Sequence, residues 1–262
     1  MAVEIRRSRR RRHANGSGAE LAQFEPIQQL RAHEYVAEQI RRHIALRLIR
    51  PGEALPSERE LASMFGVGRP TIQHAMRLLE ADQLVEARRG RSGGTFVREP
   101  AEDAGAMEEL MARVLRQRKE LEELLVYRRR FEPLVAAEAA RVRRRADVTA
   151  MWRAIRAMKE AQTEPDYMRD DTTFHLAVAG ATRNRFMEAA IEDIRLRLND
   201  TMSLLPESDT WHRRISGEHE EIARAIEARD ADAAEAAMDL HCANSEQSVH
   251  ALLSAIRRRL AT

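Results

Sequence analysis

The chain of 262 residues has one cysteine, few aromatic residues and no long apolar run. Because the lone thiol, Cys242, cannot close an intramolecular disulfide, we expect a protein of the reducing cytoplasm. A membrane helix needs about 18 or more consecutive apolar residues, and no stretch provides them. The N-terminal arginines lack a following apolar segment, so the sequence predicts neither a secretory signal nor a membrane partner.

Lysine is almost absent, since Lys119 and Lys159 are the only two, and arginine carries the positive charge. The net charge is +3 over residues 1–26, +4 over 27–98 and −5 over 99–262. A basic N-terminal third favours a nucleic-acid partner for that part of the chain, and a merely solvated basic face is the alternative. The sequence shows no glycine-rich nucleotide loop and no Ser/His/Asp set typical of hydrolases.

The length and the 44% hydrophobic content are sufficient for two domains. The run from Arg6 to Arg12 has no periodic apolar positions, so we expect a disordered basic arm that is either solvated or in contact with phosphates. The expected divisions of the chain are an arm over 1–26, a first domain over 27–98, a linker over 99–105 and a second domain over 106–260.

The first domain begins with two helical patterns. Apolar residues recur every four positions from Val36 to Leu48, and Pro51 is expected to end that helix. Ser57, followed three residues later by Glu60, forms a capping box that starts a second, short helix.

A third helix is expected after the tight turn 66–68, with Pro70 in its first turn, where a missing N–H is tolerated. Two short strands are expected at 84–87 and 95–98, joined by a basic, glycine-rich loop. Three helices followed by a basic hairpin predict a winged helix-turn-helix, whose third helix enters the major groove of double-stranded DNA.

Residues 28–98 resemble the GntR-type bacterial transcription regulators, through the stretches LPSERELA at 55–62 and VGRPTI at 67–72. The resemblance implies DNA contacts by Arg59, Arg69 and Thr71. It also implies that Gly90 lets the backbone of the wing approach the duplex.

The polar side of the third helix adds Gln73 and Arg77 to the expected DNA-binding residues, and the wing loop adds Arg89 and Arg91. Many members of the family carry arginine at the position of Gln73. Because glutamine pairs with adenine whereas arginine prefers guanine, we expect an operator that differs from the commonest family site.

The second domain shows helical periodicity and no convincing alternating strand. We therefore expect a mainly α fold, with an all-α bundle of six or seven helices whose facing sides can hold a ligand. The expected helices are near 106–119, 120–144, 147–163, 166–181, 184–204, 212–228 and 231–259.

Four residues in this bundle are candidate metal ligands. Asp171 and His175 are four apart, so they share one face of a helix and can hold an ion together, although a simple salt bridge fits the same spacing. His219 and His241 each lie among core-facing residues, where an imidazole is usually hydrogen-bonded or bound to metal.

Residues 106–256 resemble the all-helical FCD ligand domain of the FadR subfamily, through Val126-Tyr127-Arg128 with Glu132, and the Asp171, His175, His219 and His241 set. The resemblance implies a divalent ion, commonly zinc and sometimes nickel, held by one aspartate and three histidines. Arg128 has a donor fork suited to the carboxylate of a small organic acid, and an i,i+4 pair with Glu132 is compatible with that role.

The sequence as a whole predicts a homodimeric transcriptional repressor and no enzyme. We expect it to bind an inverted-repeat operator, with an affinity controlled by a small carboxylate effector at the metal. Two alternatives stay open at this stage. One is a metal-dependent hydrolase fused to a DNA-binding module, and the other is a regulator whose metal is purely structural.

Overall fold

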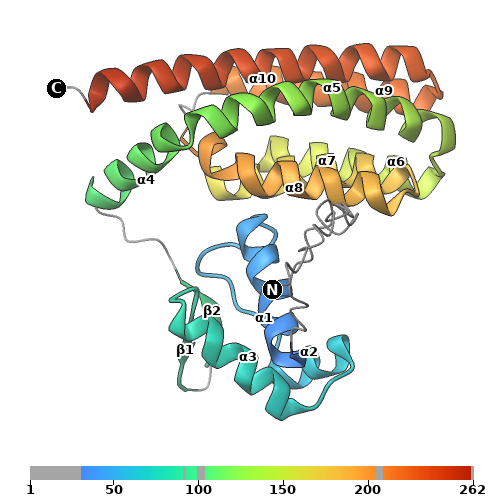
Figure 1. The fold of residues 1–262 in the computed structure, drawn as a ribbon. Helices are drawn as coiled ribbons and strands as arrows, with labels where there is room; N and C mark the ends of the chain where they lie inside the picture. Colours follow the sequence, from blue (N-terminus) through green and yellow to red (C-terminus); the bar gives the residue numbers. More distant parts are fainter. Residues whose placement is uncertain (1–30, 91–92, 99–103, 205–208, 261–262) are drawn as a thin grey trace, which may run out of the picture.

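The computed structural model describes residues 31–90, 93–98, 104–204 and 209–260, which form two parts (Figure 1). The expected basic arm, Arg91 and most of the expected linker lie outside the described residues. The smaller part contains helices α1 (Ala32–Ala45), α2 (Glu58–Phe65) and α3 (Arg69–Ala81) and strands β1 (Val85–Arg88) and β2 (Gly94–Val97).

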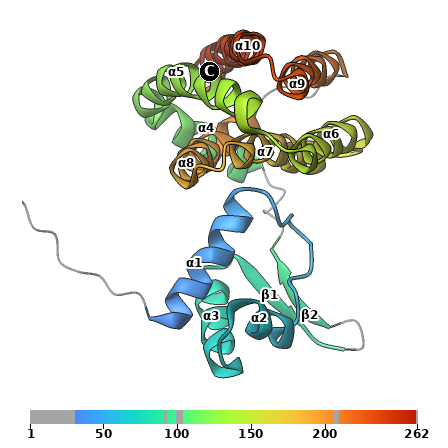
Figure 2. The same ribbon diagram turned by 90° about the vertical axis from the view of Figure 1, so that its right-hand side faces the viewer.

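The smaller part has the predicted winged helix-turn-helix arrangement. Strands β1 and β2 pair antiparallel, with Val85 opposite Val97, and the hairpin between them forms the wing (Figure 2). The apolar faces of α1 and α3 enclose a common core that includes Val36, Ile72 and Leu79. This packing fixes α3 relative to α1, so the two helices form one unit.

The capping signals predicted for α2 are present. The Ser57 side chain accepts a hydrogen bond from the Glu60 backbone N–H, and the Glu60 carboxylate accepts one from the Ser57 backbone N–H at 2.8 Å. At the other end, Gly66 has φ of 64°, a left-handed conformation that glycine adopts without a steric penalty.

We expect the Ser57→Ala variant to lose about 1 kcal/mol of the free energy that keeps α2 closed, because the first-turn N–H groups lose their acceptor. Hydrogen exchange of the α2 amides should report this loss as faster local opening. The matched control is Ser63→Ala, which changes an exposed serine on the same helix without touching its cap. Equal exchange in the two variants would contradict the capping role.

The prediction for the end of the first helix was wrong. Helix α1 ends at Ala45, before Leu48 and Pro51, because the chain reverses at Arg47, whose φ is 62°. The reversal brings the backbone N–H groups of the next residues onto the carbonyls of Arg42 to Ile44 and buries Leu46. The two strands also lie one residue from their expected positions.

The larger part is the predicted all-α bundle, with seven helices among the described residues. They are α4 (Ala104–Arg116), α5 (Arg118–Val142), α6 (Arg145–Glu160), α7 (Glu164–Ala181), α8 (Arg185–Met202), α9 (Asp209–Ala228) and α10 (Ala231–Arg259). Helix α4 starts within the expected linker. Helices α5, α9 and α10 form one layer over a second layer of α6, α7 and α8 (Figures 1 and 2). The main core lies between these layers.

The second layer of the bundle faces the winged helix-turn-helix, and the end of α1 reaches α8 (Figure 2). Side chains of Arg42 and Arg50 form ion pairs with Glu192 on α8 and Asp166 on α7. Among the described residues, no helix combines the length and apolar character needed to cross a bilayer.

Candidate metal centre and DNA-binding surface

Three of the four predicted metal ligands come together between the two layers of the bundle. His175 on α7, His219 on α9 and His241 on α10 each place a ring nitrogen within 4.8 Å of the other two. All three side chains are buried, with exposed fractions of 2% or less. Three imidazoles at this separation form a group of ligands suited to zinc or nickel.

Two of these rings contact a carboxylate through their Nδ1 atoms. His175 Nδ1 lies 2.9 Å from Glu132 Oε2 on α5, and His241 Nδ1 lies 2.9 Å from Glu218 Oε2 on α9. With the Nδ1–H group of each ring facing a carboxylate, the lone pair lies on Nε2. That atom has no partner in His175, whereas in His241 it accepts from Arg128, which a bound ion would have to displace. Metal-binding histidines usually have this arrangement, because the carboxylate fixes the ring and raises its basicity.

The electrostatics of the cluster favour neutral imidazoles. Burial lowers the pKa of His219 and of His241 well below the ordinary histidine value. A neutral ring has the free lone pair that coordination requires. Two of the rings therefore have the protonation state that a divalent ion needs.

Asp171 lies beside the three histidines and already forms an ion pair. One of its carboxylate oxygens pairs with the Arg195 guanidinium, and Oδ1 lies 3.6 Å from His219 Nε2. Burial alone would raise the pKa of Asp171, but Arg195 and the neighbouring histidines together outweigh it and hold that pKa well below the ordinary value. Asp171 is therefore an ionised oxygen donor at the edge of the cluster.

Arg128 contacts both its own helix and the histidine cluster. Its Nε donates to Glu132 Oε1 at 2.8 Å, which is the i,i+4 pair, and its Nη2 donates to His241 Nε2 at 3.1 Å. The side chain is 1% exposed, so the guanidinium lies inside the bundle against the histidine cluster.

Several buried nitrogen atoms of this cluster have no hydrogen-bond partner. They are Arg128 Nη1, His175 Nε2, Arg195 Nε and Nη1, and both ring nitrogens of His219. Leaving one buried polar group unpaired costs about 1–3 kcal/mol. The residues present therefore fit a metal ion at the histidine nitrogens and a hydrogen-bond acceptor at the guanidinium nitrogens.

Sequence reasoning missed Arg195 and Glu218. Arg195 is fully buried, and it lies on the same face of α8 as Ile191 and Leu198. A charged residue at a core-facing position was the available signal, because a buried arginine requires a partner. Glu218 gave no comparable signal, since it is one of many acidic residues on α9.

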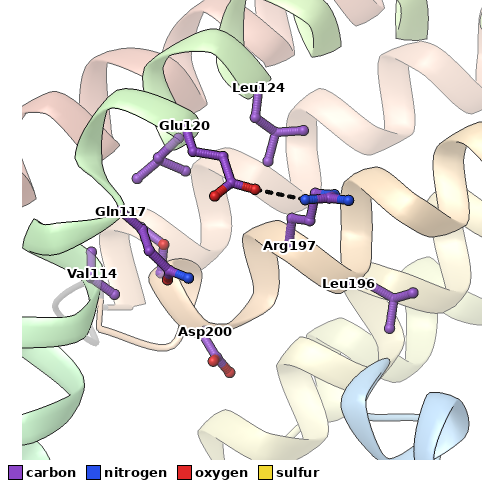
Figure 3. Close-up of a pocket in the computed structure, with 9 residues that line it drawn as sticks. Val114, Gln117, Glu120, Leu124, Leu196, Arg197 and Asp200 are labelled. Atoms are coloured by element: carbon purple, nitrogen blue, oxygen red, sulfur yellow. Dashed lines mark hydrogen bonds and ion pairs between the residues drawn. The ribbon is translucent and has the colours of Figure 1, made fainter. Parts of the chain in front are cut away.

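A separate cavity of about 180 Å³ lies between α4, α5 and α8 (Figure 3). An ion pair of 2.6 Å between Arg197 and Glu120 crosses it. None of the predicted metal ligands lines this cavity. We assign it no role.

The predicted DNA-binding residues that the structure describes lie on α2, α3 and the wing. Arg59, Arg69, Gln73, Arg77, Arg89 and Gly90 are exposed, and Thr71 is half-buried. Gln73 Nε2 donates to Glu58 Oε2 at 3.1 Å, so a base contact by this amide would replace an existing hydrogen bond.

The wing depends on two glycines for its shape. Gly90 has φ of 117°, which other residues rarely adopt. A Cβ atom on Gly93 would lie 2.6 Å from the Arg88 carbonyl oxygen, which is too close for any side chain. These two positions therefore favour glycine, and Arg89 lies exposed directly after β1.

Comparisons with known proteins agree with this arrangement. Residues 32–97 match the bacterial regulatory proteins of the gntR family, and residues 123–244 match the FCD domain. The transcriptional regulator LutR of Bacillus subtilis is 31% identical, over 76% of this chain and 92% of LutR. The Uxu operon transcriptional regulator of Escherichia coli is 32% identical, over 83% of this chain and 86% of that protein.

A third relative, the transcriptional repressor NanR of Citrobacter rodentium, is 26% identical over 89% of this chain and 91% of its own length. These relatives are transcriptional regulators and not enzymes, as the sequence predicted. The chain belongs to the gntR family of bacterial transcriptional regulators, with a DNA-binding winged helix-turn-helix followed by an FCD domain.

Proposed function

We propose that the protein is a homodimeric repressor whose operator affinity is controlled by a small organic acid bound at a divalent metal. The observation that carries this proposal is the buried cluster of His175, His219 and His241, with unpaired nitrogens beside the guanidinium of Arg128. We propose zinc as the ion, with nickel as the alternative, and Asp171 as its fourth ligand.

The metal would supply a Lewis-acidic positive charge at the centre of the bundle. The chain's own groups would do the rest of the recognition. Arg128 donates hydrogen bonds to a carboxylate of the acid, while Glu132 keeps the guanidinium in place through the bond at 2.8 Å. Burial strengthens these interactions because water does not screen them.

We propose that Arg59, Arg69, Thr71, Gln73, Arg77, Arg89, Gly90 and Arg91 form the DNA-binding surface. Two copies related by a twofold axis would bind an inverted repeat. Exposed apolar side chains on α5, which are Val126, Tyr127, Leu134 and Val142, offer a face for the second copy. The repressor role follows the name of the NanR relative, and the protein would act in the cytoplasm, where its DNA is.

The proposal is tested by thermal unfolding of the zinc-loaded and the chelated protein against a panel of small carboxylic acids. A ligand at 100 times its Kd adds about 2.7 kcal/mol, which moves the midpoint of a domain this size by about 5–11 °C. We expect one class of acid to raise the midpoint only when zinc is present. If chelation lowers the midpoint and no acid raises it, the metal is structural and the proposal fails.

We expect the Arg128→Gln variant to keep the zinc-dependent midpoint and to lose most of the acid-dependent shift. Arg128 provides the carboxylate contact, whereas the histidines hold the ion. The matched control is Arg129→Gln, which changes the exposed neighbour that pairs with Asp239. An acid response that survives in Arg128→Gln would remove Arg128 from the effector site.

A further inference from the structure

A buried polar connection runs from the metal cluster to the DNA-binding part of the chain. It begins at Asp171, whose carboxylate pairs with Arg195. Arg195 Nη2 also lies 3.3 Å from Thr172 Oγ1, and Thr172 Oγ1 lies 3.4 Å from Asn199 Oδ1. These four side chains are at most 4% exposed.

The connection ends on helix α1. Asn199 Nδ2 donates to the backbone carbonyl of Ala45 at 3.5 Å. Arg195 and Asn199 are one turn apart on α8, so they share a face of that helix. A single turn of α8 therefore touches both the metal cluster and the first helix of the winged helix-turn-helix.

The direction of every hydrogen bond in this connection is determined by its two ends. A guanidinium can only donate and a carbonyl oxygen can only accept. The Thr172 hydroxyl must accept from Arg195, so its own hydrogen points to Asn199 Oδ1. The amide nitrogen of Asn199 is then free to donate to Ala45. Arg195 and Asn199 together therefore orient the Thr172 hydroxyl, which joins the two side chains.

Ala45 is a sensitive point because it is the last residue of α1. The carbonyls of Arg42, His43 and Ile44 accept backbone N–H groups from the following turn. The Ala45 carbonyl instead accepts the Asn199 side chain from the other part of the molecule. The C-terminus of α1 is thus completed by a residue of the effector bundle.

Other contacts between the two parts differ in character. Arg42 with Glu192 and Arg47 with Asp200 are ion pairs of partly exposed side chains, and neither reaches the histidine cluster. Such pairs contribute little and are screened by salt. Asn199 is buried and continuous with the cluster, so it is suited to transmit a change between the two parts.

We propose that Asn199 is the coupling residue that reports the state of the Asp171 and histidine cluster to helix α1, through Thr172 and Arg195. Helix α1 shares its core with α3, so a change at Ala45 alters how the recognition helix is held. This inference rests on the proposed metal site, and it adds the route by which that site controls DNA binding.

The test is hydrogen exchange of the full-length protein with and without zinc ions. In the wild type, we expect zinc to slow exchange in α7, α9 and α10, and to slow it about fivefold in residues 42–50. In Asn199→Ala, the bundle should still respond to zinc, whereas residues 42–50 should not. Thr172→Val breaks the connection one step earlier without touching the interface, and it should give the same result.

The matched control is Glu192→Gln, which removes an ion pair across the same interface but leaves the connection intact. It should retain the zinc response of residues 42–50. A response retained in both Asn199→Ala and Thr172→Val, or no wild-type response in 42–50 while the bundle responds, would overturn the coupling and leave the metal site standing. No zinc response anywhere would overturn the metal site and the coupling with it.

Discussion

Replacing His219 with alanine is expected to weaken zinc binding at least about 100-fold. Loss of groups that merely orient a ligand costs about 10–100-fold in metal affinity, and His219 would be a ligand itself. Its ring is fully buried, and both of its nitrogens lack hydrogen-bond partners, so both are available to a metal ion. Titration of the protein with zinc against a competing chelator measures the change directly.

The matched control is His250→Ala, which removes a half-exposed histidine of α10 that lies outside the cluster. This variant should bind zinc as the wild type does. Circular dichroism of His219→Ala should show that the helices remain, because the substitution removes one ring from a bundle with a large apolar core. Unchanged zinc affinity in a folded His219→Ala protein would refute the proposed site.

Replacing Arg69 with alanine is expected to lower the affinity for specific DNA at least about 30-fold. One arginine contact to a base contributes about 1–3 kcal/mol, and a dimer would lose two of them. Arg69 is exposed at the first position of α3, where the recognition helix begins. Its guanidinium can therefore reach a base edge or a phosphate.

The measurement is a binding titration with DNA selected by the wild-type protein from a random library. Arg156→Ala, an exposed arginine on α6, serves as the control and should bind as the wild type does. A comparison at two salt concentrations separates base contacts from phosphate contacts, since only the loss of a phosphate contact reduces the salt dependence of binding. If Arg69→Ala and Arg156→Ala bind equally well, α3 is not the helix that reads the DNA.

The winged helix-turn-helix could be predicted from the sequence because its signals are local. The capping box of Ser57 and Glu60, the left-handed Gly66 and the first-turn Pro70 each act within four residues of the chain. Such signals depend on backbone geometry, which the sequence specifies directly. The same reasoning failed at the end of α1, because the chain reverses at Arg47 with a left-handed φ of 62°, a conformation that an arginine in the sequence does not signal.

The candidate site was predictable as a set of residue types, but only the packing of the helices shows its arrangement. Periodicity places His175, His219 and His241 on inward faces of their helices. Their convergence within 4.8 Å depends on how α7, α9 and α10 pack against each other across the bundle. The same packing pairs Asp171 with Arg195, a residue that sequence reasoning did not select.

The sequence therefore determined the features that depend on nearby residues, and the tertiary structure decided those that depend on residues far apart in the chain. The amino-acid sequence was sufficient for the fold class and the family, since these follow from short-range patterns, and it singled out the candidate ligands. The partners of the buried charges, the unpaired nitrogens and the connection from Arg195 to Ala45 required the tertiary structure. Those contacts join residues far apart in the chain, and only the packed core determines which of them meet.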